Sequence, residues 1–380
     1  GCRGKTMVKL ILSEEETMLA ESARGFLDAD APVSKLRALR DEGRTHDPAL
    51  WAQMAAMGWC GVLVPEDNGG VDMGHAAAGV IAHELGKTLA ASPFLSTAVM
   101  AATALKQVDS AASAERLSAI AEGRLTYALA LDETSKFAPE NSRLACEKSG
   151  NGFVLNGQKC FVVDGGFADR VLVLARSGEG PEDLTLFDLP ADHAGITRND
   201  QAMIDSRNAA RLEFDNVEAT GDDIIGAAGD AMRVLRPALQ AGQAALSAEM
   251  TGLAASAADM TVGYLKERQQ FGRPIGSFQA LQHRAAHLWC EMEVTGSAIL
   301  HAGRMLDSDP DNAAMAVSLA KARAIKTAKL AVIEAVQMHG GIGMTDAFDM
   351  GFFMKRARVA SEWLGDYGYH AEQVAAARGF

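Results

Sequence analysis

The most informative segment of the sequence spans residues 264–283 and reads Tyr-Leu-Lys-Glu-Arg-Gln-Gln-Phe-Gly-Arg-Pro-Ile-Gly-Ser-Phe-Gln-Ala-Leu-Gln-His. Its glycines and proline predict a loop that ends one long helix and precedes the next. The loop carries Arg268, Phe271 and Gln279. Arginine makes bidentate bonds to phosphate groups, phenylalanine offers a stacking face, and glutamine both donates and accepts hydrogen bonds. These residue types suit a ligand with a pyrophosphate and an aromatic ring.

A second unusual segment covers residues 337–345, Gln-Met-His-Gly-Gly-Ile-Gly-Met-Thr. Glycines lack Cβ atoms, so a ligand can approach such a backbone closely. The preceding helix is expected to start after the turn at residues 307–311 and to end at His339. Either segment alone is more commonly a helix-capping loop than a ligand site, so the two carry weight only together.

Residue composition and spacing divide the chain into three successive regions. Residues 12–123 are rich in Ala, Leu, Met and Glu at helical spacing, and residues 125–225 change to strand-like runs with Gly-rich turns. From about residue 230, long helices return, as in an up-down bundle. The expected domains are a helical domain at 7–124, an antiparallel β-barrel at 125–226 and a four-helix bundle at 227–380.

Two finer expectations follow from the same patterns. Asn156-Gly157 lies between two strand-like runs and is typical of a turn. The cations of the last long helix, which are Lys321, Arg323, Lys326 and Lys329, are expected to line a solvent-exposed face.

Composition and charge limit the class of protein. The 380 residues are 48% apolar and 22% charged, which is ordinary for globular domains. With 36 basic and 49 acidic residues the net charge is −13, which excludes a protein that binds nucleic acid through surplus cations. No stretch reaches the roughly 20 apolar residues of a membrane helix. Neither nucleic acid nor a membrane is therefore an expected partner.

The N-terminus and the cysteines bear on location. The first residues lack the apolar run of a secretory signal. Met7 is expected to be the natural start, and whether residues 1–6 belong to the natural chain stays open. The five cysteines are Cys2, Cys60, Cys146, Cys160 and Cys290. Their odd number and wide spacing argue against disulfides and predict a reducing, cytoplasmic compartment.

Common catalytic and metal motifs are absent from the sequence. His283 and His287 share a helix face but lack the glutamate of His-Glu-x-x-His, so we expect a polar surface and no metal. There is no Gly-x-Ser-x-Gly, no Walker loop and no Gly-x-Gly-x-x-Gly after a strand. A two-domain nicotinamide dehydrogenase is therefore not expected.

Together, Arg-x-x-Phe-Gly-x-Pro-Ile-x-x-Phe-Gln from Arg268 and Gln-x-His-Gly-Gly-Ile-Gly from Gln337 resemble the flavin-dependent acyl-CoA dehydrogenase family. The resemblance covers almost the whole chain, and residues 156–163 look like the family's mid-barrel strand. It implies an α+β multidomain fold with an N-terminal all-α domain, a central antiparallel β-barrel and a C-terminal four-helix bundle. Residues 264–283 are especially similar to the small-subunit type of pimeloyl-CoA dehydrogenase-like proteins.

The resemblance also implies FAD and the residues that would bind it. The adenosine-diphosphate half would be held by Arg268, Gln270, Phe271, Ile275, Phe278 and Gln279, and the pyrophosphate closed over by Gln337, Gly340 and Gly341. Phe161 and Val163 would stand beside the isoalloxazine ring. In this family the loop groups reach the neighbouring subunit's flavin, so a homodimer, a homotetramer or a heteromer with a homologous subunit is implied. The implied substrate is an acyl-CoA, and the implied electron acceptor is an electron-transfer flavoprotein.

The catalytic base is where the pattern departs from the family. The usual base is a glutamate directly before a Gly-Thr pair, and here Leu364, Gly365 and Asp366 occupy those positions. Some relatives take the base from the helix before the Arg268 loop, where this chain has Gly242 and, two helical turns on, Glu249. Asp366 is the best remaining base and Glu249 the second choice, while a helix cap or a surface ion pair is the alternative role for Asp366.

Three functions stay open at this point. The first is an FAD-dependent acyl-CoA dehydrogenase of fatty acid metabolism that desaturates the Cα–Cβ bond of a CoA thioester. The second is a non-catalytic subunit that lends its loops to a homologous partner's flavin, which the missing base and the altered stretch 131–135 favour. The third, and least favoured, is a flavin monooxygenase on the same fold.

Overall fold

The computed structural model describes residues 10–180 and 183–380. The expectations about Met7 and Cys2 lie outside the described residues. The helices are α1 Glu14–Asp30, α2 Val33–Asp41, α3 Pro48–Ala56, α4 His75–Thr88, α5 Ala102–Lys106, α6 Ala111–Ala121, α7 Ala231–Glu267, α8 Gln279–Ser308, α9 Ala314–His339, α10 Met350–Glu362 and α11 Tyr367–Ala377. The strands are β1 Tyr127–Ala130, β2 Ala145–Ser149, β3 Gly152–Val163, β4 Arg170–Arg176, β5 Leu184–Pro190, β6 Ile196–Asp200, β7 Ala209–Ala219, β8 Gln269–Gln270 and β9 Arg273–Pro274.

Local signals explain where the first helices begin. Ser13 and Glu16 form a reciprocal capping box at the start of α1. Asp47 caps α3 and is followed by Pro48 at the first helical position, where a missing N–H costs nothing. Between α4 and α5 a π-helical segment, Phe94–Ala101, is buried along its whole length. The N-terminal part of the chain is therefore helical, as the sequence predicts.

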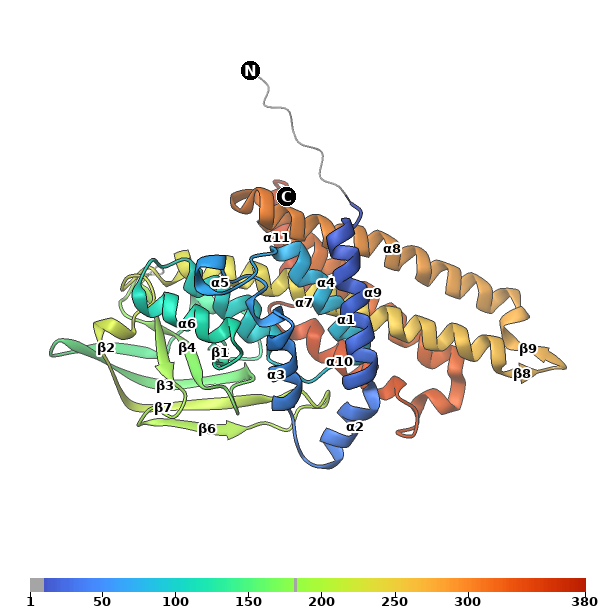
Figure 1. Ribbon diagram of the computed structural model, residues 1–380, viewed down its shortest axis with the longest axis horizontal. Helices are drawn as coiled ribbons and strands as arrows, with labels where there is room; N and C mark the ends of the chain where they lie inside the picture. The colour runs from blue at the N-terminus through green and yellow to red at the C-terminus, as the bar shows by residue number, and fades with distance from the viewer. Residues whose placement is uncertain (1–9, 181–182) are drawn as a thin grey trace, which may run out of the picture.

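The central part of the chain is a single curled sheet (Figure 1). Its strands follow the order β1-β4-β2-β3-β7-β6, and β5 pairs with β4. Most pairings are antiparallel, whereas β1–β4 and the short β2–β4 pairing are parallel, which the sequence pattern did not indicate. Buried and exposed residues largely alternate along β7. Because successive side chains of a strand point to opposite faces, β7 has one face toward the core and one toward solvent.

The C-terminal part is a bundle in which α7 packs against α8, α9 and α10. Helix α9 ends at His339, as predicted, because Gly340 adopts a positive φ of 66°. Figure 1 shows the β8–β9 hairpin at the far end of α7 and α8, opposite the end where the sheet lies. The helical, sheet and helical order confirms the predicted fold class.

Two finer expectations are wrong. The Asn156-Gly157 pair is not a turn, because β3 runs through it and pairs with β2 and β7 on its two sides. The bulge at this place lies in β7, which has one extra residue between Phe214 and Val217. Lys321 does not face water, since its side chain is fully buried between α9 and α10 and donates to the Ala360 carbonyl at 2.7 Å. Lys326 and Lys329 are exposed and Arg323 is half-buried.

None of the helices in the described ranges is long and apolar enough to cross a membrane.

Candidate functional site

The segment after α7 forms a short hairpin. Strands β8 and β9 pair in register, and the two turn residues, Phe271 and Gly272, have φ values of 55° and 77°. Positive φ at both positions is the geometry of a two-residue hairpin turn. The Phe271 ring is 89% exposed at the tip, and Arg273 lies 4.1 Å from the centre of the Phe278 ring behind it. The hairpin is therefore a preformed projection with an uncovered aromatic ring.

The glycine-rich segment lies beside the base of this hairpin. The rings of Tyr264 and His339 are stacked with centroids 4.6 Å apart, which joins the end of α7 to the end of α9. A Cβ atom added at Gly340 or Gly341 would meet nothing within 4 Å. Open space above a bare backbone is what close approach of a ligand requires.

We call the surface formed by Arg268, Phe271, Gln279, Gln337, Gly340 and Gly341 the hairpin face. Its polar side chains are exposed, and in residues 10–180 and 183–380 the side chains of Arg268, Gln279 and Gln337 have no hydrogen-bond or ion-pair partner. Gln270 is exposed as well, and Ile275 and Phe278 are half-buried behind the hairpin. Free donors and an exposed ring leave this face able to bind a phosphate-bearing ligand.

Phe161 and Val163 lie in β3, in the sheet, and therefore at the other end of the molecule from the hairpin (Figure 1). They line a cavity of about 10 Å³, which we call the barrel pocket; its other lining residues are Ser96, Met100, Leu129, Leu131, Asp132, Trp363 and Leu364. A cavity of this size holds about one water molecule. The predicted cofactor residues of one chain are thus divided between two distant places.

Leu364, which the family resemblance places at the position of the usual base, lines the barrel pocket. Its side chain is 2% exposed, and its φ of 60° is unusual for a leucine. A Cβ atom at Gly242, the alternative base position, would lie 2.7 Å from the Met100 side chain and 3.0 Å from that of Leu364. Leu364 and Met100 therefore fill the space that both base positions share.

Asp366 lies outside the barrel pocket. Its carboxylate accepts from the Tyr369 backbone N–H at 2.8 Å as the cap of α11, and from Lys136 Nζ at 2.9 Å. The hydrogen bond from Tyr369 and the pairing with Lys136 lower the pKa of Asp366 below its usual value. It borders a hollow of about 540 Å³ formed by α9, α10 and the start of α11. A carboxylate with a lowered pKa is a weaker proton acceptor.

Glu249 belongs to a buried ion network. Its Oε1 lies 2.5 Å from Arg207 Nη2 and 3.5 Å from Arg356 Nη1, and Arg356 also pairs with Asp205 at 2.8 Å. Arg207 lies 5.1 Å from the centre of the Trp363 ring, beside the barrel pocket. Two arginines thus lie against one oxygen of the Glu249 carboxylate, Oε1.

Sequence reasoning missed several residues around the barrel pocket. Nothing in the sequence pairs Lys136 with Asp366, because they are far apart in the chain and meet only where the sheet meets the bundle. Asp132 borders both the barrel pocket and an outer hollow of about 690 Å³, and burial raises its pKa to about 7. Its Oδ1 is buried without a hydrogen-bond partner in the described part of the chain. The one signal for Asp132 in the sequence was its position just after a strand.

No group of three or more His, Cys, Asp or Glu side chains in the described ranges could hold a metal ion. His283 and His287 are exposed on α8, and His287 Nε2 lies 4.0 Å from Glu291 Oε1. The cysteines at 60, 146, 160 and 290 are free thiols.

Comparison with known proteins defines the class. The N-terminal, middle and C-terminal domains of acyl-CoA dehydrogenases match residues 13–124, 132–217 and 229–378. The chain is 31% identical over 354 residues to acyl-CoA dehydrogenase IpdE2 of Mycobacterium tuberculosis, covering 92% of this chain and 93% of the relative. It is 30% identical to IpdE2 of Mycolicibacterium smegmatis over 355 residues, covering 93% and 96%. The chain belongs to the acyl-CoA dehydrogenase family, which consists of FAD-dependent oxidoreductases.

Solved structures agree with this assignment. A chain described with the electron transferring flavoprotein of Acidaminococcus fermentans superposes with a TM-score of 0.91 at 25% identity, over 98% of this chain and 99% of that one. The ChsE4–ChsE5 complex of Mycobacterium tuberculosis superposes with a TM-score of 0.88 at 23% identity, over 97% and 98%. The latter likeness concerns the fold alone.

The two ends of the molecule differ in how well they fit FAD. At the hairpin face, the free guanidinium of Arg268 and the open space above Gly340 and Gly341 fit a pyrophosphate. At the barrel pocket, a cavity of about 10 Å³ does not fit an isoalloxazine ring. FAD is the cofactor of the family, and of the two groups of predicted residues the hairpin face is the one whose surroundings fit a part of it.

Proposed function

We propose that this chain is the non-catalytic subunit of a heteromeric acyl-CoA dehydrogenase. In this proposal its hairpin face binds the adenosine-diphosphate half of an FAD whose isoalloxazine ring lies in a homologous partner subunit. The observation that carries the proposal is Leu364 at the usual base position, packed with Met100 over a cavity of about 10 Å³. Neither an acyl chain nor a flavin ring fits there.

The chemistry of the family explains why the base matters. Desaturation removes an α-proton to a carboxylate while the β-hydrogen leaves as hydride, which FAD accepts when it is bound. A leucine side chain cannot accept a proton, and Glu249 is held by two arginines. The partner must therefore supply the carboxylate and the space for the thioester, whereas this chain supplies phosphate-binding groups.

The Lys136–Asp366 ion pair supports the same proposal. It joins the loop after β1 to the start of α11, between the hollow of about 540 Å³ and that of about 690 Å³. By the family resemblance, Asp366 stands at a flavin-contacting position. The pairing with Lys136 engages a carboxylate that would otherwise be free to contact a flavin.

Similar proteins also favour a heteromer. The ChsE4–ChsE5 complex has the same fold and is a complex of two differently named chains. The match to a structure described with electron transferring flavoprotein supports electron transfer from the assembly to such a carrier. An acyl-CoA substrate, a pimeloyl-type small-subunit role and a cytoplasmic location complete the proposal.

A second candidate is a complete α,β-desaturase with Asp366 as base, and one observation favours it. The Asp366 carboxylate borders a hollow of about 540 Å³, large enough for part of a ligand. Against it stand the lowered pKa of Asp366 and its two hydrogen bonds. A flavin monooxygenase needs no base, but it needs the flavin-side space that Met100 and Leu364 fill.

Anaerobic titration with acyl-CoA thioesters separates the two candidates. The protein is co-expressed with a homologous chain that retains the glutamate, and bleaching of the flavin absorbance is followed. If this chain is non-catalytic, Asp366→Asn in it leaves bleaching by a competent acyl-CoA unchanged, because asparagine still caps α11. Loss of bleaching in that variant, with flavin still bound, would establish Asp366 as the base.

A further inference from the structure

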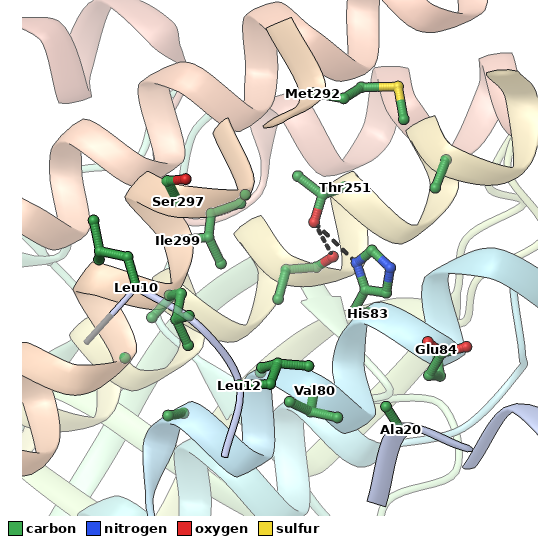
Figure 2. A pocket seen from close by; sticks show the side chains of 18 of the residues that line it. Leu10, Leu12, Ala20, Val80, His83, Glu84, Thr251, Met292, Ser297 and Ile299 are labelled. Carbon is green, nitrogen blue, oxygen red and sulfur yellow. Dashed lines mark hydrogen bonds between the residues drawn. The ribbon is translucent and has the colours of Figure 1, made fainter. Parts of the chain in front are cut away.

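A further hollow, apart from the barrel pocket and the hairpin face, lies between α1, α4, α7 and α8 (Figure 2). It has a volume of about 470 Å³, within the range of small-molecule sites. Small side chains line much of it, including Ala20, Gly79, Ala244, Ala248 and Ala255. These residues leave room because none has an atom beyond Cβ.

An extended apolar segment of the chain crosses this hollow just before α1 begins. Leu10 and Leu12 line it and are still 50% and 41% exposed. Figure 2 shows them on an extended segment, with Leu12 near Val80 and Leu10 toward Ser297 and Ile299. Half-covered leucines beside empty space indicate that the hollow has capacity for further apolar contact.

One polar group in the hollow has a defined hydrogen-bonding state. The Thr251 hydroxyl donates to the Ala248 carbonyl at 2.8 Å, so its oxygen accepts from His83 Nδ1 at 3.2 Å (Figure 2). Burial lowers the pKa of His83 to about 4, so the ring is neutral at pH 7. With the proton on Nδ1, the Nε2 atom is an acceptor. In the described part of the chain it has no hydrogen-bond partner.

The surrounding charges disfavour an anion. Glu84, next to His83 and lining the hollow, has a side chain only 4% exposed. Its carboxylate pairs with Arg24 at 3.3 Å and Lys87 at 3.1 Å, and Asp28 and Glu21 add negative charge near Arg24, so carboxylates balance the two cations. A ligand carboxylate near His83 would find an acceptor nitrogen and a second carboxylate rather than a donor.

We propose that this hollow binds a small apolar molecule that carries one uncharged hydrogen-bond donor, a hydroxyl or an amide, directed at Nε2 of His83. The site is independent of the proposed function. Ala244, Ala248 and Thr251 lie on the face of α7 opposite Gly242 and Glu249, since residues are spaced by 100° around a helix.

Isothermal titration calorimetry of the purified protein in its natural assembly tests the proposal, with octan-1-ol and octanoate as probes. The expected result is saturable binding of one octan-1-ol per chain, with octanoate at least about tenfold weaker. His83→Phe keeps a ring but removes the acceptor and should weaken octan-1-ol binding about tenfold. Ala255→Phe fills the hollow and should abolish binding.

The control for the added ring is Ala112→Phe, at an exposed position on α6, which should bind octan-1-ol as the unchanged protein does. Absence of saturable binding, equal binding of octanoate, or unchanged binding in Ala255→Phe would each overturn the proposal. The comparison of octan-1-ol with octanoate needs no variant, so it holds even if a substituted chain fails to fold.

Discussion

Leu364 is fixed by its backbone as well as by its side chain. Its carbonyl accepts from Gln243 Nε2 at 3.2 Å and from His370 Nε2 at 3.0 Å. These bonds hold a left-handed backbone conformation that a leucine otherwise avoids. The side chain is thereby directed at Met100 and into the barrel pocket.

Leu364→Glu is expected to destabilise the protein without creating a base. The new carboxylate would be buried without a partner, at a cost of more than about 3 kcal/mol in the free energy of unfolding. Urea denaturation measures this cost, and Leu364→Met is the matched control, with an expected loss below about 1.5 kcal/mol. A Leu364→Glu chain that is stable and whose flavin is bleached by acyl-CoA would contradict the account of the pocket.

Arg268→Ala is expected to weaken FAD retention by the assembly. A charge-assisted phosphate contact is worth about 1.5–3 kcal/mol, or about tenfold to more than a hundredfold in the dissociation constant. Flavin content after dialysis measures the effect. Arg233→Ala, which removes an exposed arginine paired with Asp230, should leave flavin content unchanged. Equal retention in the two variants would remove Arg268 from the site.

Lys321 should make stability depend on pH. Burial lowers its pKa from 10.5 to about 7, so between these values the unfolded chain binds one more proton than the folded chain. The free energy of unfolding should therefore rise with pH across this window, by up to about 1.4 kcal/mol per unit from this group. Lys321→Met should flatten that slope in urea denaturation at pH 7–9. An unchanged slope in Lys321→Met would show that the lysine does not titrate there.

Among the elements, the sequence indicated the order of helical, strand-rich and helical parts and some of the individual helices and strands, but not how they meet. The hairpin after α7 could be predicted as a loop from its glycines and proline, and the end of α9 from Gly340. The turn expected at Asn156-Gly157 does not form, because the pairing of β3 with strands on both sides outweighs the local preference for a turn. The expectation that Lys321 faces water was wrong because α9 is covered by α7, α10 and α11. The spacing of residues along a helix does not show which neighbours will cover it.

The same limit applies to the candidate site. Its hairpin face lies on two nearly continuous segments, so a motif could point to it. The barrel pocket combines β1, β3, the π-helical segment and the end of α10, and its closure depends on Met100 and Leu364 meeting in space. Sequence reasoning placed Leu364 at the position of the usual base but gave no sign that Met100 lies beside it.

The buried ion network links α7 to α10 and to the loop before β7. Glu249→Gln would remove a negative charge that Arg207 and Arg356 both pair with. Because buried arginines then lack a partner charge, the free energy of unfolding should fall by about 3–5 kcal/mol. Glu362→Gln, which breaks the exposed pair with Arg358, is the control and should cost less than about 1 kcal/mol. Similar losses in both variants, measured by urea denaturation, would argue against a stabilising role for the network.

At the scale of the whole molecule, the predicted cofactor residues form two groups at opposite ends of the chain (Figure 1). One chain therefore cannot surround a single FAD with both groups. The hairpin face is open and polar, whereas the barrel pocket is closed by apolar side chains. This asymmetry is what distinguishes a subunit that lends a half-site from one that holds a flavin of its own.

The most direct test is the FAD content per chain, measured from visible absorbance together with the mass of the assembly. The account predicts no retained FAD when the chain is purified alone, and one FAD per two chains when it is assembled with a homologous subunit that has the catalytic glutamate. One FAD per chain in a homodimer or homotetramer would contradict it, because each copy would then hold a flavin in the pocket that Leu364 and Met100 close.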